Sequence, residues 1–296
     1  MDKLNFTITN KADLKQCKEQ LLADKEVQIL LKNNNWNQDD LDKNLISFIN
    51  YSEDRKHCAN CNGLYMCNKD IAGYCLDISS QDFSEVLIPC RYLIEEKKLY
   101  AHQKNYTICH LSKKELLNNF NNIDLSNEDK YYQDVIDLLK QWLNSKSSKG
   151  FYFVGKLGVG KTFLASCLAN EEAKRNKKVA FVKVPTFCQQ LKSNLDDKDY
   201  IEKYLGKAYH SDLLVLDDIG AENTTPWIRD DIILPILDYR MENEKRTLFT
   251  SNCTLDELRK RLAISVNGDF VKADRILERI RSLSSVITIT GVSRRK

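Results

Sequence analysis

A glycine-rich segment offers the clearest chemistry in the chain: residues 155–162 read Gly-Lys-Leu-Gly-Val-Gly-Lys-Thr and match the pattern G-x-x-x-x-G-K-S/T. Its glycines let successive backbone N–H groups surround phosphate oxygens, because no Cβ stands in the way. Lys161 can reach the β- and γ-phosphates, and the Thr162 hydroxyl can ligate magnesium. Residues 163–174 are predicted to form a helix whose positive dipole end faces the same anion. We therefore expect a nucleotide to contact Gly155, Gly158, Val159, Gly160, Lys161, Thr162 and Phe163.

A second motif is acidic. An apolar run that begins at Leu213 ends in two adjacent carboxylates, Asp217 and Asp218. Ligands of open α/β sheets bind outside the carboxyl ends of the strands, so these side chains should face the phosphate loop. We expect Asp217 to hold magnesium and Asp218 to orient and polarise the attacking water. Together the two motifs predict a site that binds a nucleoside triphosphate with Mg²⁺ and hydrolyses it.

Further polar residues fall near the ends of later predicted elements. Asn252 ends the sequence Thr-Ser-Asn, and its amide can hydrogen-bond the γ-phosphate or the attacking water. Arg275 and Arg279 are four residues apart, so they share one face of a predicted helix. They are either solvated arginines or part of a guanidinium finger that reaches the γ-phosphate of a neighbouring subunit.

Cysteine spacing indicates a site of another kind. The chain has ten cysteines, and five of them are clustered: Cys58, Cys61, Cys67, Cys75 and Cys90. Without a secretion signal, such a cluster favours metal binding over disulfides or unligated thiols. The C-x-x-C pair Cys58 and Cys61 can direct two thiolates at one point, and we choose Cys75 and Cys90 as the second pair, with Cys67, Cys109 or a histidine as alternatives. Four thiolates leave no position for water, so the predicted zinc is structural.

The composition is that of a protein that can bury a core of its own. Of the 296 residues, 42% are hydrophobic and 29% are charged, which excludes a wholly disordered chain. No apolar run of about 18 residues occurs, so we expect no membrane span. The N-terminus carries no secretion signal, so we expect a cytoplasmic protein. The net charge of +3 argues against a general coating of nucleic acid but allows one local basic groove.

The pattern of apolar runs divides the chain into three parts. Residues 1–108 combine a helical first half with a cysteine-rich, more strand-like second half. Residues 109–130 are predicted to form a polar linker, and residues 131–296 an ATP-binding domain. In that domain short apolar runs alternate with helix-length segments, which is typical of a parallel sheet covered by helices. We predict an α/β P-loop fold with a five-stranded parallel sheet, preceded by a small α+β domain; the five runs are 151–154, 179–184, 213–216, 247–250 and 286–290.

In this order, the motifs resemble those of the AAA+ ATPases, and specifically of the bacterial replicative helicase loaders of the DnaC/DnaI type. Residues 216–222, Leu-Asp-Asp-Ile-Gly-Ala-Glu, are similar to that family's acidic motif, and residues 250–252 to its sensor 1. The resemblance implies that Arg279 is the arginine finger and that Arg294 is a sensor 2-like arginine near the nucleotide. It also implies an AAA+ domain without the α-helical lid of most relatives.

The cysteine-rich region resembles the zinc-binding first domain of the DnaI branch, which docks on the helicase. Its ligand spacing suits Cys58, Cys61, Cys75 and Cys90, although better-known members have a histidine where this chain has Cys75. The resemblance implies a primosome component that binds a hexameric DnaB-type helicase, forms a homo-oligomer with ATP and delivers the helicase to single-stranded DNA. ATP, Mg²⁺ and Zn²⁺ would be its cofactors. We expect slow hydrolysis, because Asp218 stands where most AAA+ proteins have a glutamate.

Three other interpretations use the same motifs. An IstB-like transposition-associated ATPase resembles the AAA+ part, but the cysteine-rich first domain disfavours it. A DnaA-like initiator needs a lid and a C-terminal helix-turn-helix, and only six residues follow Thr290. An adaptor that ATP switches without turnover would show the same sequence features, so hydrolysis measured with and without single-stranded DNA would separate it from an ATPase.

Overall fold

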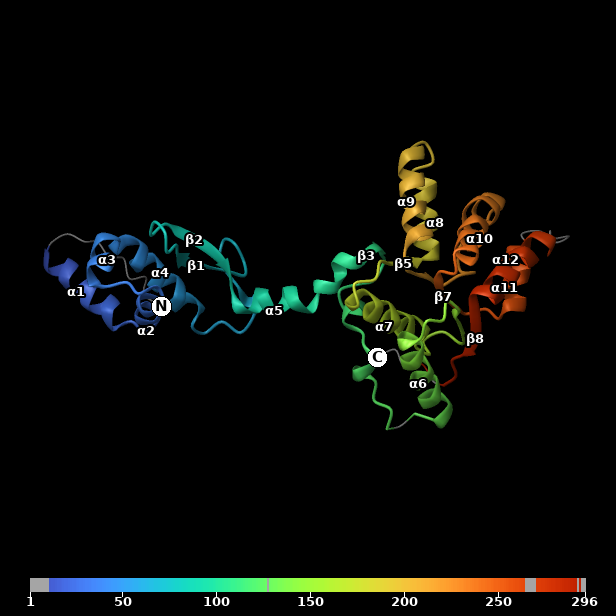
Figure 1. The fold of residues 1–296 in the computed structure, drawn as a ribbon, viewed down its shortest axis with the longest axis horizontal. Coiled ribbons are helices and arrows are strands. Elements are labelled where there is room, and N and C mark those ends of the chain that lie inside the picture. Colours follow the sequence, from blue (N-terminus) through green and yellow to red (C-terminus); the bar gives the residue numbers. More distant parts are fainter. Residues whose placement is uncertain (1–10, 127, 264–269, 292, 294–296) are drawn as a thin grey trace. The chain divides into compact units, whose positions relative to one another are not determined.

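The computed structural model describes residues 11–126, 128–263, 270–291 and 293. The chain divides into two compact units, Met1–Leu99 and Tyr100–Lys296, whose elements are coloured in chain order in Figure 1. The elements of the first unit are α1 (Lys11–Ala23), α2 (Lys25–Asn34), α3 (Gln38–Lys43), α4 (Leu45–Cys58), the short 3₁₀ turn η1 (Leu64–Met66), β1 (Tyr74–Ile78), β2 (Glu85–Pro89) and α5 (Arg91–Leu99).

Helices α1, α2 and α4 pack around one apolar core in the first unit, which includes Val27, Phe48 and the β1 residue Ile78. Helix α3 begins with a capping box, in which Asn37 and Asp40 each accept a backbone N–H of the other with their side chains. Strands β1 and β2 form an antiparallel pair. The first unit is therefore a small domain of helices and a short sheet, as the sequence predicts.

The second unit carries the longer list of elements. They are the 3₁₀ turns η2 (Ala101–Asn105), η3 (Glu115–Leu117) and η4 (Phe120–Asn122), the π-helical segment η5 (Ile228–Ile233), the strands β3 (Tyr106–Cys109), β4 (Gly150–Val154), β5 (Val179–Lys183), β6 (Leu213–Asp217), β7 (Arg246–Ser251) and β8 (Ser284–Thr288), and the helices α6 (Lys130–Asn144), α7 (Lys161–Lys174), α8 (Val184–Ser193), α9 (Lys198–His210), α10 (Leu234–Glu242), α11 (Leu255–Leu262) and α12 (Phe270–Leu283).

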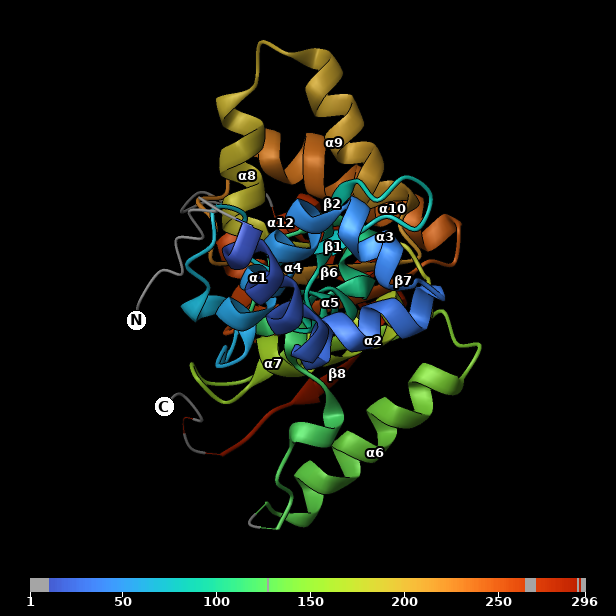
Figure 2. The same cartoon turned by 90° about the vertical axis from the view of Figure 1, so that its left-hand side faces the viewer.

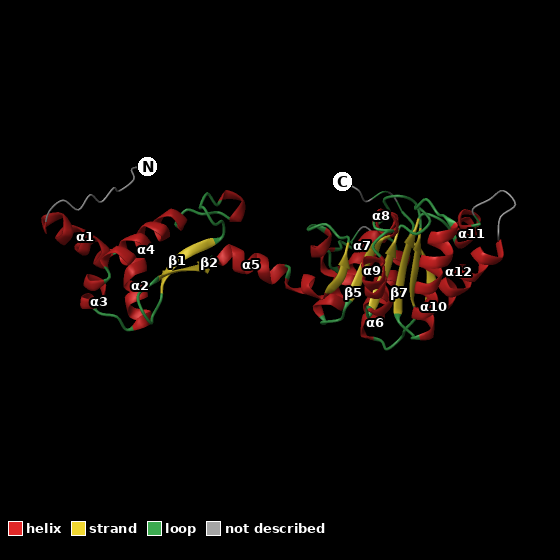
Figure 3. Cartoon of the chain, turned by 90° about the horizontal axis from the view of Figure 1, so that it is seen from above, coloured by secondary structure: helices red, strands yellow, loops and turns green. Residues whose placement is uncertain are grey.

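A parallel sheet with the strand order β3-β5-β6-β7-β4-β8 is the centre of the second unit. Successive strand residues point to opposite faces. Phe181 belongs to the core shared with α6 and α7, whereas Val182 belongs to the core shared with α8, α10 and α12. Helices cover both faces, as Figure 3 shows, which explains why the strands read as nearly continuous apolar runs.

Helices α8 and α9 lie between β5 and β6 in the chain and form a hairpin that is visible in Figure 2. The rings of Phe187 and Tyr204, one from each helix, have centroids 5.0 Å apart. No helix in the described part of the chain is both long and apolar enough to cross a membrane.

A sixth strand, β3, joins the five that were predicted. It pairs in parallel with β5, so the sheet has six strands rather than five. The predicted domain boundary at residue 108 is corrected for the same reason, because the first compact unit ends at Leu99 and β3 belongs to the second. Strand β3 has only four residues, too few for its alternation to stand out from the polar sequence around it.

The predicted linker, residues 109–130, is also corrected. Leu116 is buried in the core beneath α7. The side-chain amide of Asn170, on α7, donates to the carbonyl oxygens of Glu115 and Asn118, at 3.0 and 2.9 Å. The polar composition that indicated a linker reflects a segment whose backbone is fixed to a helix by hydrogen bonds rather than by apolar burial alone.

Candidate functional site

The phosphate loop joins β4 to α7 at the carboxyl edge of the sheet. Gly160 has a φ of 101°, a conformation that glycine adopts without steric cost. A Cβ at Gly155 would lie 2.2 Å from the carbonyl oxygen of Ile289, so only glycine fits there. Gly155 and Val159 do not line the adjoining cavity of about 540 Å³, and Val159 is buried in the core beneath α7. The other predicted contacts do line it: Gly158, Gly160, Lys161, Thr162 and Phe163.

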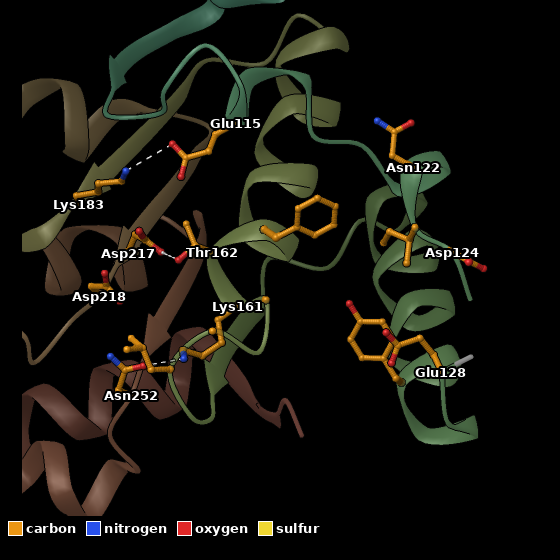
Figure 4. A pocket seen from close by; sticks show the side chains of 16 residues that line it. Glu115, Asn122, Asp124, Glu128, Lys161, Thr162, Lys183, Asp217, Asp218 and Asn252 are labelled. Carbon is orange, nitrogen blue, oxygen red and sulfur yellow. Dashed lines mark hydrogen bonds and ion pairs between the residues drawn. The ribbon is translucent and has the colours of Figure 1, made fainter. Parts of the chain in front are cut away.

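The Lys161 side chain is 5% exposed and lies at this cavity (Figure 4). Its Nζ donates to the carbonyl oxygens of Gly155 and Lys156, at 2.9 Å each, and to Oδ1 of Asn252, at 2.7 Å. The predicted sensor residue Asn252 therefore touches the loop lysine, although 91 positions separate them. Because these three acceptors are neutral, phosphate oxygens would bind the ammonium group more strongly.

Asp217 ends β6 next to the loop and is 1% exposed. Its Oδ1 accepts from the hydroxyls of Thr162, at 2.9 Å, and Thr250, at 2.7 Å. Its Oδ2 is buried and has no hydrogen-bond partner among the described residues. Burial raises the pKa of Asp217 to about 6, against the bonds from Thr250 and Thr162, which lower it. A buried carboxylate oxygen without a partner, beside a hydroxyl with free lone pairs, fits Mg²⁺, which prefers oxygen ligands.

Asp218 follows directly and also lines the cavity. Its φ of 58° lies in the left-handed region, which is uncommon for a residue with a Cβ. Its N–H donates to Oγ1 of Thr250 at 2.9 Å, and the N–H of Ile219 donates to the carbonyl oxygen of Thr250 at 3.0 Å. The turn after β6 is thereby fastened to the end of β7.

Four charged residues that line the cavity were not predicted: Glu115, Lys183, Asp124 and Glu128. Glu115 and Lys183 form an ion pair at 3.5 Å, shown in Figure 4. Lys183 ends β5 in register with Asp217, so attention to the carboxyl end of every predicted strand would have found it. Glu115 falls in the predicted linker, where no sequence signal marked it. The facing wall of the cavity is formed by Asn122, Ile123, Asp124, Glu128 and Tyr132.

The predicted arginine finger, Arg279, lies on α12 and does not line this cavity. Its Nε donates to Oδ1 of Asp238, on α10, at 2.6 Å, and its Nη1 donates to Glu278 at 2.8 Å. Arg275, one turn earlier, is exposed. The structure thus groups neither arginine with this cavity of its own chain. Arg294, the predicted sensor 2-like residue, lies outside the described residues.

A second cavity, of about 470 Å³, lies in the first unit and is lined by the clustered cysteines. The Sγ atoms of Cys58 and Cys75 are 3.8 Å apart. Burial, followed by the neighbouring Cys58 thiol, raises the pKa of Cys75 to about 11. Several thiols around one cavity suit zinc, which prefers sulfur and nitrogen ligands. All four predicted ligands line it, namely Cys58, Cys61, Cys75 and Cys90, and so does Cys67, one of the alternatives.

Only two of the four predicted zinc ligands are in close contact. In the described part of the chain, the close group of possible metal ligands consists of Asp54, Cys58 and Cys75, whose ligand atoms lie within 4.8 Å of one another. Asp54 was not predicted. Its Oδ2 accepts from Nζ of Lys69 at 2.7 Å and from the N–H of Leu76 at 2.9 Å. Asp54 therefore fastens β1, which carries Cys75, to the end of α4.

Two family models match this chain, one at each end. A family model described as the primosomal protein DnaI N-terminus matches residues 1–82, and one described as IstB-like ATP binding protein matches residues 76–296. The replicative helicase loader DnaI of Bacillus subtilis (strain 168) is 35% identical over 294 residues, which cover 95% of this chain and 93% of that protein. The chain belongs to the DnaI family of replicative helicase loaders.

Solved structures of this family have the fold of the second unit. A crystal structure of DnaI superposes with a TM-score of 0.56 at 36% sequence identity, and covers 63% of this chain and 98% of that chain. A crystal structure of the DnaC helicase loader gives a TM-score of 0.51 at 25% identity, and covers 60% of this chain and all of that one (100%).

Membership of the DnaI family bears on one of the alternative interpretations, the transposition-associated ATPase. The IstB-like match lies over the ATP-binding unit, whereas the match of residues 1–82 is to a primosomal protein. The transposition-associated ATPase is therefore disfavoured, and the second unit is an AAA+ ATP-binding domain, as the sequence predicts.

Proposed function

We propose that this chain is an ATP-dependent loader that delivers a hexameric DnaB-type replicative helicase to single-stranded DNA, as a primosome component in replication initiation or restart. The observation that carries the proposal is the convergence of the phosphate loop with Asp217 and Asn252 around one cavity. It occurs in a chain that matches a DnaI loader along 95% of its length.

The motif residues of the cavity would have distinct roles in hydrolysis. The ammonium of Lys161 would exchange its carbonyl acceptors for β- and γ-phosphate oxygens. Oδ2 of Asp217 and the hydroxyl of Thr162 would hold Mg²⁺, which, when bound, neutralises charge on the transferring phosphate. Asp218 would orient the attacking water. Because Oδ1 of Asn252 is engaged by Lys161, its Nδ2 group is the part that would donate to the γ-phosphate or the water.

The arginines support an ATP-dependent homo-oligomer. Arg279 lies outside the cavity of its own chain, paired with Asp238, which suits a finger that acts on the nucleotide of a neighbouring subunit. Arg294 would contact the nucleotide as the family resemblance implies. Subunits would then associate through ATP, because one supplies the phosphate loop and the next supplies the guanidinium group.

The first unit would bind zinc and dock on the helicase. Cys58, Cys61, Cys75 and Cys90 would be the zinc ligands, since all four line one cavity. Bound zinc would supply folding free energy to this small unit, on the order of 10 kcal/mol. Asp54 would act as a positioning residue, because it fixes the strand of Cys75 against the helix of Cys58.

Contacts to single-stranded DNA would come from local basic residues, because the net charge of the chain is only +3. One candidate patch is residues 174–178, Lys-Arg-Asn-Lys-Lys. In this patch, the Arg175 guanidinium donates to the carbonyl oxygen of Leu143 and to Oδ1 of Asn144. This side chain therefore connects the end of α7 to the end of α6.

The test is a helicase-loading assay with the full chain, the hexameric helicase and single-stranded DNA, run together with ATP hydrolysis. Lys161→Ala should abolish both nucleotide binding and loading. Lys156→Ala is the matched control: this exposed lysine lies in the same loop, and only its backbone carbonyl contacts Lys161. Loading that survives Lys161→Ala would contradict the proposal. Nucleotide-dependent loading without measurable turnover would identify an ATP-switched adaptor instead.

A further inference from the structure

Thr250 places a single hydroxyl between the two acidic residues of the site. It lies on β7 and is fully buried. Its Oγ1 donates to Oδ1 of Asp217 at 2.7 Å and accepts the backbone N–H of Asp218 at 2.9 Å. The direction of both bonds is fixed, because an ionised carboxylate can only accept and a backbone N–H can only donate.

The bond from the Asp218 N–H to Thr250 Oγ1 helps to hold an unusual backbone conformation. Asp218 has a φ of 58°, and a left-handed conformation costs free energy at a residue with a Cβ. Such a conformation persists where the surrounding contacts hold it. Thr250 holds this conformation with two hydrogen bonds: its Oγ1 accepts the N–H of Asp218, and its carbonyl oxygen accepts the N–H of Ile219. The direction of the Asp218 side chain therefore depends on Thr250.

The first bond limits the rotation of the Asp217 carboxylate. Oδ1 receives one hydroxyl from the phosphate loop, at Thr162, and one from the neighbouring strand, at Thr250. With both donors on Oδ1, Oδ2 is the oxygen left for a cation. Removal of the Thr250 hydroxyl would leave Asp217 with one donor and a freer carboxylate.

We infer that Thr250 is a positioning residue that sets the magnesium-holding carboxylate of Asp217 and the water-orienting carboxylate of Asp218 through one hydroxyl. The inference rests on the proposed ATPase function and adds to it a residue that touches neither nucleotide nor water. It requires that the hydroxyl, rather than the shape of the side chain, couples the two acids. Loss of the hydroxyl should therefore affect magnesium-dependent steps while leaving the contacts of Lys161 with phosphate in place.

The variants that separate hydroxyl from shape are Thr250→Val, which keeps the branched side chain, and Thr250→Ser, which keeps the hydroxyl. Thr247→Val is the matched control. Thr247 is also fully buried on β7, and its Oγ1 accepts from Nε of Arg240 at 2.9 Å, at the other end of the strand. Thr250→Ala offers a second variant without the hydroxyl, should the valine fail to pack.

The measurement is the affinity of the full chain for a fluorescent ATP analogue, with Mg²⁺ and with EDTA, together with kcat and KM for ATP. The ratio of the two affinities reports the magnesium contribution within one sample. In EDTA, the affinity of Thr250→Val for the analogue should lie within about twofold of the wild-type affinity. The ratio of its affinity with Mg²⁺ to its affinity in EDTA should be about tenfold smaller than the wild-type ratio, as expected for a lost bond to a charged group. Its kcat should fall about 100-fold, with a smaller change in KM.

Rescue by Thr250→Ser and unchanged ratios in Thr247→Val complete the expected result. If the wild type shows the magnesium enhancement and Thr250→Val and Thr250→Ala keep it with an unchanged kcat, the inference is overturned while the proposed function stands. An equal loss in Thr247→Val would also overturn it, because the effect would then come from the strand as a whole. A wild type that binds no nucleotide would overturn both.

Discussion

The Nζ atom of Lys161 lies 2.7 Å from Oδ1 of Asn252, so the phosphate loop and the end of β7 are joined by a direct hydrogen bond. The bond connects the segments that follow β4 and β7, which are neighbouring strands in the sheet. A phosphate group that replaces the carbonyl acceptors of Lys161 would move the ammonium group while it stays bonded to Asn252. The position of the Asn252 amide is therefore linked to the presence of the γ-phosphate.

We expect Asn252→Ala to separate nucleotide binding from hydrolysis. The variant keeps Lys161 and its bonds to the carbonyl oxygens of Gly155 and Lys156, so affinity for ATP should change little. Hydrolysis should fall about 100-fold, as expected when one aligned donor is removed from a reacting phosphate. Titration with a fluorescent nucleotide and single-turnover kinetics measure the two effects. A large loss of affinity for ATP with an unchanged rate of hydrolysis would contradict this prediction.

The finger assignment of Arg279 can be tested by mixing two inactive variants. Arg279→Ala should lower hydrolysis about 1,000-fold, while each chain still binds nucleotide. A mixture of Arg279→Ala with Lys161→Ala should recover activity, because one variant keeps the loop and the other keeps the finger. Arg275→Ala, on the same helix face, is the control and should behave as wild type. Failure of the mixture to recover would place Arg279 in a structural role with Asp238.

Stability should decrease on the acid side because of His110. Its Nδ1 accepts the backbone N–H of Lys183 at 3.1 Å, which requires a neutral ring, and burial lowers its pKa from 6.5. The unfolded chain then binds the proton more readily, so this contribution is complete above pH 6.5 and declines as the pH falls toward the lowered value. Urea unfolding between about pH 5 and pH 8 measures the slope. His110→Asn can keep the acceptor without titrating, and an identical slope in that variant would exclude His110 as the cause.

Arg240 should contribute strongly to the stability of the second unit. Its guanidinium is fully buried and donates to the carbonyl oxygens of Ala208, Ser211 and Arg246. Burial lowers its pKa to about 9. Arg240→Met should reduce the free energy of unfolding by about 3 kcal/mol, because the carbonyl groups lose their donors.

Urea denaturation followed by circular dichroism is the measurement for Arg240. Arg259→Met is the comparison, since Arg259 is a partly exposed arginine that pairs with Asp274 at the surface, and it should change the unfolding midpoint far less. Similar losses in the two variants would show that burial of Arg240 does not determine its contribution.

The metal proposal leads to a prediction for individual cysteines of the full chain. Cys75→Ser should remove bound zinc and lower the unfolding temperature, because Cys75 is buried beside Cys58. Cys67→Ser should keep the metal, because the Sγ of Cys67 accepts the N–H of Gly73 in the same cavity. Atomic absorption on the purified proteins gives the zinc content per chain. Zinc retained by Cys75→Ser and lost by Cys67→Ser would exchange the two assignments.

The nucleotide motifs were predictable because each is local. The phosphate loop is a contiguous pattern, and Asp217 follows an apolar run that reads as a strand. Glu115, Thr250 and Asp54 could not be assigned their contacts in this way. Each of them contacts residues that are distant in the sequence and lie on another strand or helix. No spacing in the sequence marks such pairs.

Strand β3 has a practical consequence for work with parts of this protein. A shortened chain that began at residue 131 would lack β3 and would leave the backbone of β5 unpaired along one side. Unpaired strand edges promote self-association, so such a fragment would be prone to aggregate even with its nucleotide cavity intact. A fragment that begins at Tyr100 would retain the covering strand, together with the segment that Asn170 secures to α7.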